Sequence, residues 1–121
     1  MAHNYKELEV WKRAMSIAKS IYTLTKKFPI DEKFGLTSQI QRAAVSIASN
    51  IAEGAGRGTD KDFVHFLNIA LGSAFEVETQ VLLSLDLGYL SNEDSKDILD
   101  NIRVIQPQLN ALIKKYGEII I

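Results

Sequence analysis

The sequence predicts an all-α protein, an up-down-up-down bundle of four antiparallel helices. Apolar residues recur at helical spacing along most of the chain, and no segment shows the alternating pattern of a β-strand. Short polar or glycine-containing segments separate four such stretches, so consecutive helices should be antiparallel neighbours. The 121 residues are enough for a single domain, 1–121, with helices at about 5–28, 37–56, 60–87 and 92–116.

The first two helices are bounded by recognisable start and stop signals. Asn4 with Glu7 three residues later forms a capping-box pattern, and Pro29 ends the first helix after Phe28. Residues 31–35 form a connector that can hold one helical turn. The second helix ends in the glycine-rich segment 54–58, which we interpret as a helix end and turn rather than a phosphate-binding loop, because it follows a helix and not a strand.

The last two helices have similar signals. Thr59 is placed to cap the third helix, and Gly88 is placed to terminate it. Ser91 caps the fourth helix, in which Pro107 should produce a kink. The apolar end of the chain, residues 119–121, is either frayed or docked on a partner.

The first helix carries more apolar surface than one core requires. One seam follows strict 4-3 spacing: Val10, Ala14, Ile17, Ile21, Leu24 and Phe28. A second seam of apolar residues lies beside it. Together the two seams span roughly 200° of the helix circumference, whereas one core-facing stripe needs ~100°. We therefore expect the protein to self-associate through the second seam; the alternative is a broadly buried helix in a monomer. The second seam contains Leu8, Trp11, Met15 and Tyr22.

Composition narrows the functional classes. The chain has no cysteine, two histidines, and 14 Lys and Arg against 15 Asp and Glu, giving a net charge of −1. Disulfides and thiolate metal sites are excluded, and a generally basic nucleic-acid-binding protein is disfavoured. No apolar run is long enough to span a membrane and no apolar leader is present, so we expect a cytoplasmic protein without a membrane partner.

Positive charge gathers on the first helix. Residues 1–28 hold six Lys and Arg and two Asp and Glu, a net charge of +4. Residues 59–90 hold one Lys and five Asp and Glu, a net charge of −4. The basic residues form either a phosphate-binding strip or a solvated face that complements the acidic helices. We favour the second interpretation because no aromatic residue interleaves the lysines. The candidate nucleic-acid contacts are Lys12, Arg13, Lys19, Lys26 and Lys27.

A polar stripe runs along the second helix and continues on the third. Because the turn between them centres near residue 58, residues at the same level should have numbers that sum to about 117. We therefore expect Arg42 to pair with Glu76, near Ser46 or Ser73, and we expect Gly72 to mark a close crossing. The ion pairs and hydrogen bonds of this stripe would set the register of the two helices or form an interface. The stripe contains Arg42, Ser46, Asn50, Glu53 and Arg57 on the second helix, and Ser73 and Glu76 on the third.

We find no sequence signature of catalysis. There is no nucleophile–base pair, and Asp62 with His65 does not provide the several carboxylates and two Glu-x-x-His pairs of a metal site in a helical bundle. We therefore expect no enzymatic activity, no cofactor and no metal. A small-molecule or hydrolytic site at Glu53 and Glu76 is an alternative.

Two segments carry a specific family resemblance. Residues 41–57, QRAAVSIASNIAEGAGR, and residues 63–76, FVHFLNIALGSAFE, resemble the four-helix-bundle proteins encoded within intervening sequences of 23S rRNA genes. The likeness extends over residues 5–116 and, more remotely, to the accessory variability determinant of diversity-generating retroelements. It implies a homopentameric ring of antiparallel bundles without established enzymatic activity, for which nucleic-acid binding is suspected. The family's polar signature falls on Arg42, Ser46, Asn50, Glu53, Gly54, Arg57, Gly72, Ser73 and Glu76.

Together these observations predict a non-catalytic oligomeric scaffold or adaptor for a protein or RNA partner. The alternative is a nucleic-acid-binding ring that uses the basic face of the first helix. The site at Glu53 and Glu76 is the second alternative.

Overall fold

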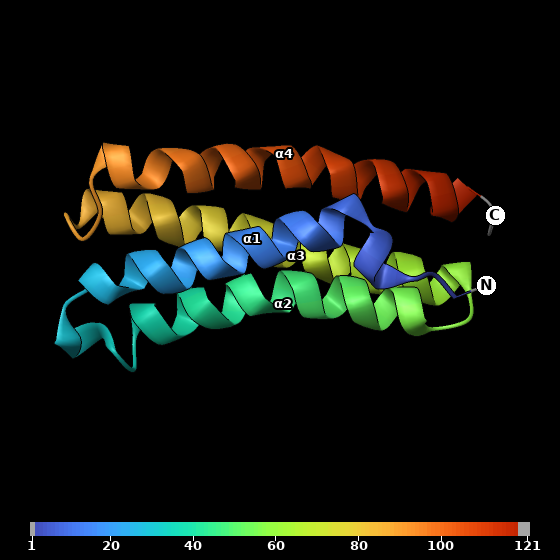
Figure 1. Ribbon diagram of the computed structural model, residues 1–121, viewed down its shortest axis with the longest axis horizontal. Coiled ribbons are helices and arrows are strands. Elements are labelled where there is room, and N and C mark those ends of the chain that lie inside the picture. The colour runs from blue at the N-terminus through green and yellow to red at the C-terminus, as the bar shows by residue number, and fades with distance from the viewer. Residues whose placement is uncertain (1, 119–121) are drawn as a thin grey trace.

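The computed structural model describes residues 2–118, and within them every regular element is helical. The four long helices are α1 (Glu9–Leu24), α2 (Leu36–Gly56), α3 (Asp60–Asp86) and α4 (Asn92–Gly117). They lie side by side along the long axis, and the first and last described residues lie at the same end of the molecule (Figure 1). The all-α prediction is therefore confirmed for the described residues, whereas residues 119–121 lie outside them.

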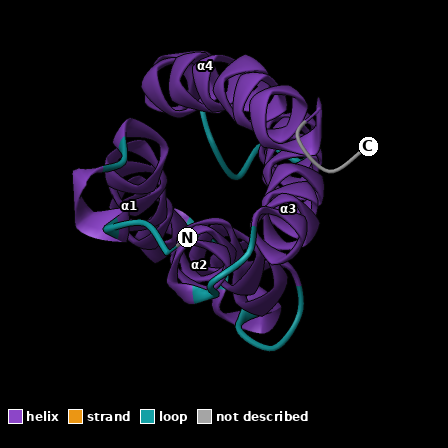
Figure 2. Cartoon of the chain, turned by 90° about the vertical axis from the view of Figure 1, so that its right-hand side faces the viewer, coloured by secondary structure: helices purple, strands orange, loops and turns teal. Residues whose placement is uncertain are grey.

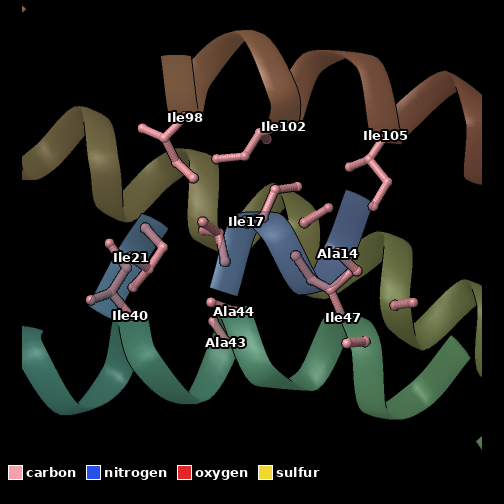
Figure 3. Packing of buried hydrophobic residues seen from close by; sticks show 14 of the residues in the cluster. Ala14, Ile17, Ile21, Ile40, Ala43, Ala44, Ile47, Ile98, Ile102 and Ile105 are labelled. Carbon is pink, nitrogen blue, oxygen red and sulfur yellow. The ribbon is translucent and has the colours of Figure 1, made fainter. Parts of the chain in front are cut away.

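The core lies between all four helices. Seen end-on, the helices surround a common centre, and α1 neighbours both α2 and α4 (Figure 2). Ala14, Ile17 and Ile21 of the strict 4-3 seam are completely buried. They pack between α2, through residues such as Ile47, and α4, through residues such as Ile102 (Figure 3). The apolar spacing in the sequence therefore identified the face of α1 that enters the core.

Local caps end the helices where the sequence indicated. The Thr59 hydroxyl accepts a hydrogen bond from the backbone N–H of Asp62 at 3.2 Å, and the Ser91 hydroxyl accepts one from Asp94 at 3.0 Å. Gly88 follows α3 with φ of +78°, a conformation that favours glycine. α4 continues as a helix on both sides of Pro107.

The expected first helix, 5–28, is interrupted at both ends. A 3-10 turn, η1 (Tyr5–Glu7), precedes α1, and Leu8 between them is extended, with φ of −74° and ψ of 127°. The Asn4 side chain accepts from the backbone N–H of Lys6 at 3.2 Å, so it caps η1 rather than α1. A second 3-10 turn, η2 (Thr25–Lys27), follows α1.

Contacts across the bundle explain the break at Leu8. The backbone N–H of His3 donates to the carbonyl of Ala55 at 2.7 Å. The His3 ring lies 4.7 Å from the ring of Phe63 and 5.0 Å from that of Tyr116. These contacts hold the N-terminal segment against α2, α3 and α4, so it leaves the axis of α1. Periodicity within the segment does not contain this information.

Gly54, and not Gly72, marks the close approach of α2 to α3. A Cβ atom built on Gly54 would lie 2.7 Å from Cβ of Phe66 and 3.2 Å from Cδ1 of Phe63. A Cβ on Gly72 would meet no atom within 4 Å. The prediction of a close crossing at Gly72 is therefore wrong. Gly72 lies on the solvent side of α3, where a missing side chain brings no backbones together.

The connector between α1 and α2 contains the expected helical turn, η3 (Ile30–Glu32), and a capping contact that the sequence did not indicate. The Glu32 carboxylate accepts from the backbone N–H of Leu36 at 3.1 Å and from the Tyr89 hydroxyl at 2.8 Å. Gly35, the N-cap residue of α2, has no side chain to cap the helix, so Glu32 satisfies one of its free N–H groups. The hydrogen bond from Leu36 is the largest cause that lowers the pKa of Glu32 below its usual value, and the bond from Tyr89 is the next. The same bond to Glu32 raises the pKa of Tyr89.

We expect Gly54→Ala to destabilise the protein. Overpacking against Phe66 costs about 1–3 kcal/mol, whereas the better helix propensity of alanine contributes about 1 kcal/mol in the opposite direction. The matched control is Gly56→Ala in the same helix, because a Cβ there meets nothing within 4 Å. Chemical denaturation of the two variants should place the free energy of unfolding of Gly54→Ala below that of the control. Equal stability would contradict the close approach.

We expect acid to weaken the α1–α2 connector. A carboxyl group whose pKa is lower in the folded state stabilises the fold above its unfolded pKa, and this contribution is lost as the pH falls through the folded value. The melting temperature of the wild type should therefore fall between about pH 7 and about pH 3, and Glu32→Gln should reduce this fall. Glu7→Gln, which removes an exposed carboxylate elsewhere, is the control. An identical fall in the wild type and Glu32→Gln would refute the role of Glu32.

Candidate interaction surfaces

The centre of the polar stripe joins α2 to α3. The hydroxyl oxygens of Ser46 and Ser73 are 2.9 Å apart, a hydrogen bond between half-buried and buried side chains. Asn50 donates through Nδ2 to the carbonyl and to the hydroxyl of Ser46, at 2.8 and 2.9 Å. The numbers 46 and 73 sum to 119, close to the expected 117. This part of the stripe is a helix–helix contact that fixes the level of α2 against α3.

The expected pair of Arg42 and Glu76 does not form. Both residues are exposed, and neither takes part in an ion pair or hydrogen bond among the side-chain contacts of residues 2–118. Ser46 and Ser73 occupy the seam itself, and Arg42, four residues before Ser46, lies about 40° further around α2. The prediction of a partly buried pair is therefore wrong, and both charges face solvent.

The remaining charges of the stripe make a local pair. Arg57 lies 3.3 Å from the carboxylate of Glu53, one helical turn earlier, and both side chains are about half exposed. The guanidinium of Arg57 also lies over the ring of Phe66, 5.0 Å from its centroid. In residues 2–118, no group of three or more His, Cys, Asp or Glu is placed to hold a metal ion, and this includes the surroundings of Asp62 and His65.

The basic residues of α1 do not form one continuous strip. Arg13 turns towards α4, where it donates to Asn101 at 2.7 Å and to Gln108 at 3.2 Å. Lys27, in η2, pairs with Asp94 of α4 at 2.8 Å, and Lys12 lies 3.5 Å from Glu9. Lys19 lines a groove, and Lys26 is exposed. Two of the five candidate contacts, Arg13 and Lys27, therefore connect the N-terminal region to α4.

The groove between α1 and α4 contains charges of both signs. It has a volume of about 330 Å³ and presents Lys19 and three hydroxyl side chains alongside Asp94 and Asp97. The hydrogen bond from Lys27 is the main cause that lowers the pKa of Asp94. Aspartates on the wall opposite Lys19 oppose an anion there, so the groove is not suited to a phosphate backbone.

The second apolar seam of α1 is largely used inside the molecule. Leu8, Trp11 and Met15 are half-buried and pack against the core, and the Trp11 ring contacts that of Tyr5 at 5.2 Å. Tyr22 alone of the four seam residues is exposed, at 47%. The folded η1 segment therefore covers part of the surface that the sequence assigned to another copy.

The larger exposed apolar surface lies on α3, which sequence analysis did not single out. Its exposed apolar side chains keep between 39% and 50% of their surface accessible. The signal was present in the sequence, because apolar residues occur all round this helix and such helices are normally buried on every side. We call these residues, together with the exposed C-cap residue Leu87, the exposed α3 face: Ile69, Phe75, Leu82 and Leu83.

One part of the α3 surface is already satisfied within the chain. Glu78 accepts from Arg103 at 3.0 Å and from Gln106 at 2.9 Å, both on α4. The hydrogen bond from Gln106 is the largest cause that lowers the pKa of Glu78, and the bond from Arg103 is the next.

No helix in the described part of the chain is both long and apolar enough to cross a membrane.

Comparisons with known proteins agree with this architecture. Residues 6–111 match the family described as 23S rRNA-intervening sequence protein. A crystal structure from Bacteroides thetaiotaomicron, of a protein with unknown function from the S23 ribosomal protein family, superimposes with a TM-score of 0.80 and 31% sequence identity. The alignment covers 87% of this chain and 98% of that one. No curated protein matches the chain. Because the family match spans most of the sequence, this chain belongs to the 23S rRNA-intervening sequence protein family.

Proposed function

We propose that the protein is a non-catalytic bundle of antiparallel helices that self-assembles into a scaffold or adaptor for a protein or RNA partner. The observation that carries this proposal is the exposed α3 face. Monomeric proteins seldom leave large contiguous apolar patches in water, and a helix that is apolar all round favours burial on its outer side as well.

The antiparallel arrangement is supported by pairs that lie at matching levels. Arg13 bonds to Gln108 and Lys27 to Asp94, so a later position on the N-terminal side meets an earlier position on α4. The first and last described residues also lie at one end of the bundle (Figure 1). Side-by-side packing of such bundles around an axis would close into a ring. The family resemblance supports five copies in that ring.

A scaffold role is favoured over a role in catalysis by how the polar stripe is used. Ser46 and Ser73 bond to each other across the α2–α3 seam, and Asn50 bonds to Ser46 within α2. Glu53 is paired with Arg57 on the surface. Neither Glu53 nor Glu76 lines the α1–α4 groove.

We expect the purified protein to have about five times the monomer mass in multi-angle light scattering at micromolar concentration. Burial of the exposed α3 face supplies the driving force, because removing apolar surface from water favours association. The mass should remain high in moderate salt, since that force does not depend on charge. A monomer mass over the whole micromolar range would refute self-assembly.

We expect RNA to bind only weakly and with strong salt dependence. Of the five candidate contacts, only the side chains of Lys19 and Lys26 take part in no ion pair or hydrogen bond among the described contacts, and the groove beside Lys19 also contains aspartates. Replacing both lysines with glutamate should abolish the weak binding measured by fluorescence anisotropy, and each lost phosphate contact should reduce the log–log salt slope by about 0.7.

Arg13→Gln is the control for this experiment. Because Arg13 bonds to α4, its replacement should lower the melting temperature and leave the log–log salt slope of RNA binding nearly unchanged. Tight RNA binding that persists at physiological salt would favour the nucleic-acid-binding ring instead.

A further inference from the structure

The groove between α1 and α4 has two polar walls. Ser16, Lys19 and Ser20 lie about one helical turn apart on the α1 wall, so they share one side of that helix. Asp94 and Asp97 are also one turn apart and form the α4 wall. The volume of about 330 Å³ falls within the range of small-molecule sites, about 300–1,000 Å³. The groove can therefore hold a small ligand that reaches both walls.

Only two of the charged side chains in this groove lack a partner within residues 2–118. Asp94 is paired with Lys27 at 2.8 Å, so its charge is already balanced. The side chains of Lys19 and Asp97 form no ion pair with each other or with any other described residue. One cation and one anion thus remain for a ligand, and a ligand with charge of one sign would leave one of them without a complement.

Lys19 and Asp97 lie at different levels along the bundle. With α1 and α4 antiparallel, the ion pair of Lys27 with Asp94 places at one level residues whose numbers sum to about 121. Asp97 is then level with residue 24, which is five residues beyond Lys19, or about 7.5 Å along the axis. A ligand with one charge at each end can therefore contact both side chains.

The groove also offers apolar surface and free hydroxyl groups. Leu24 is half-buried and Ile98 is 1% exposed, and both line the groove. A short aliphatic chain would cover them and remove their surface from water. The hydroxyl groups of Ser16 and Ser20 form no hydrogen bond among the described residues, so they can donate to a carboxylate that lies beside Lys19.

We propose that the α1–α4 groove binds a small zwitterion, in which a short aliphatic chain joins an ammonium group to a carboxylate. Lys19 and the two serines of the α1 wall bind the carboxylate, and Asp97 binds the ammonium group. The leucine and isoleucine contact the chain between the two charges. The proposal goes beyond the scaffold role and does not depend on self-assembly, because one copy supplies the whole groove.

Three probes with a four-carbon chain separate the two charge contacts. γ-Aminobutyrate carries both charges, butyrate carries only the carboxylate, and butylamine carries only the ammonium group. Ligand-observed NMR titration of the full chain should give γ-aminobutyrate a dissociation constant of about 1 mM. Butyrate and butylamine should each bind about tenfold more weakly, because each lacks one charge-assisted contact.

Two variants test the residues that make these contacts. Lys19→Gln should weaken the binding of γ-aminobutyrate about tenfold and leave that of butylamine unchanged, because butylamine has no carboxylate. Asp97→Asn should weaken the binding of γ-aminobutyrate to the same extent and leave that of butyrate unchanged. Lys26→Gln and Asp100→Asn are the matched controls, since both residues are exposed and neither lines the groove.

The controls should bind γ-aminobutyrate as the wild type does, and circular dichroism should show that every variant remains helical. The proposal is overturned if γ-aminobutyrate does not bind at about ten times the expected dissociation constant, or if butyrate or butylamine binds as tightly. Equal affinities in the groove variants and the controls would also overturn it. A monomeric protein that binds γ-aminobutyrate through Lys19 and Asp97 would refute self-assembly and support this proposal.

Discussion

The close packing of α2 against α3 is the constraint on which the other surfaces depend. Gly54 lets the backbone of α2 approach Phe63 and Phe66, since any side chain at this position would collide with them. Further along the seam, Ser46 and Ser73 satisfy each other's hydroxyl groups, so polar atoms can lie in a tight contact without losing hydrogen bonds. The seam therefore fixes both the separation and the level of the two helices.

The α2–α3 seam also determines which side chains remain outside the contact. Because small side chains fill the contact, the long side chains of Arg42 and Glu76 are placed on its outer rim, and their charges stay in water. The same geometry directs one side of α3 into the core and leaves apolar side chains on its flanks exposed. The α3 surface thus follows from how α2 and α3 pack, and not from any looseness of the fold.

Features encoded locally could be predicted from the sequence, and features that depend on distant contacts could not. Thr59, Gly88 and Ser91 act within one helical turn, so their capping roles were evident. The level of Ser46 against Ser73 was predicted within two residues, because a short turn leaves little freedom. The break at Leu8 depends on His3 reaching Ala55 and the ring of Phe63, which no local pattern encodes.

The candidate surfaces show the same division. Sequence spacing identified surplus apolar residues on α1, but the folded η1 segment and the core take up most of them, as the contact of Tyr5 with Trp11 illustrates. The surplus on α3 has no such cover in the described chain. A glycine in a helix indicated a close approach in general terms, yet only the packing distinguishes Gly54, which is buried, from Gly72, which faces solvent.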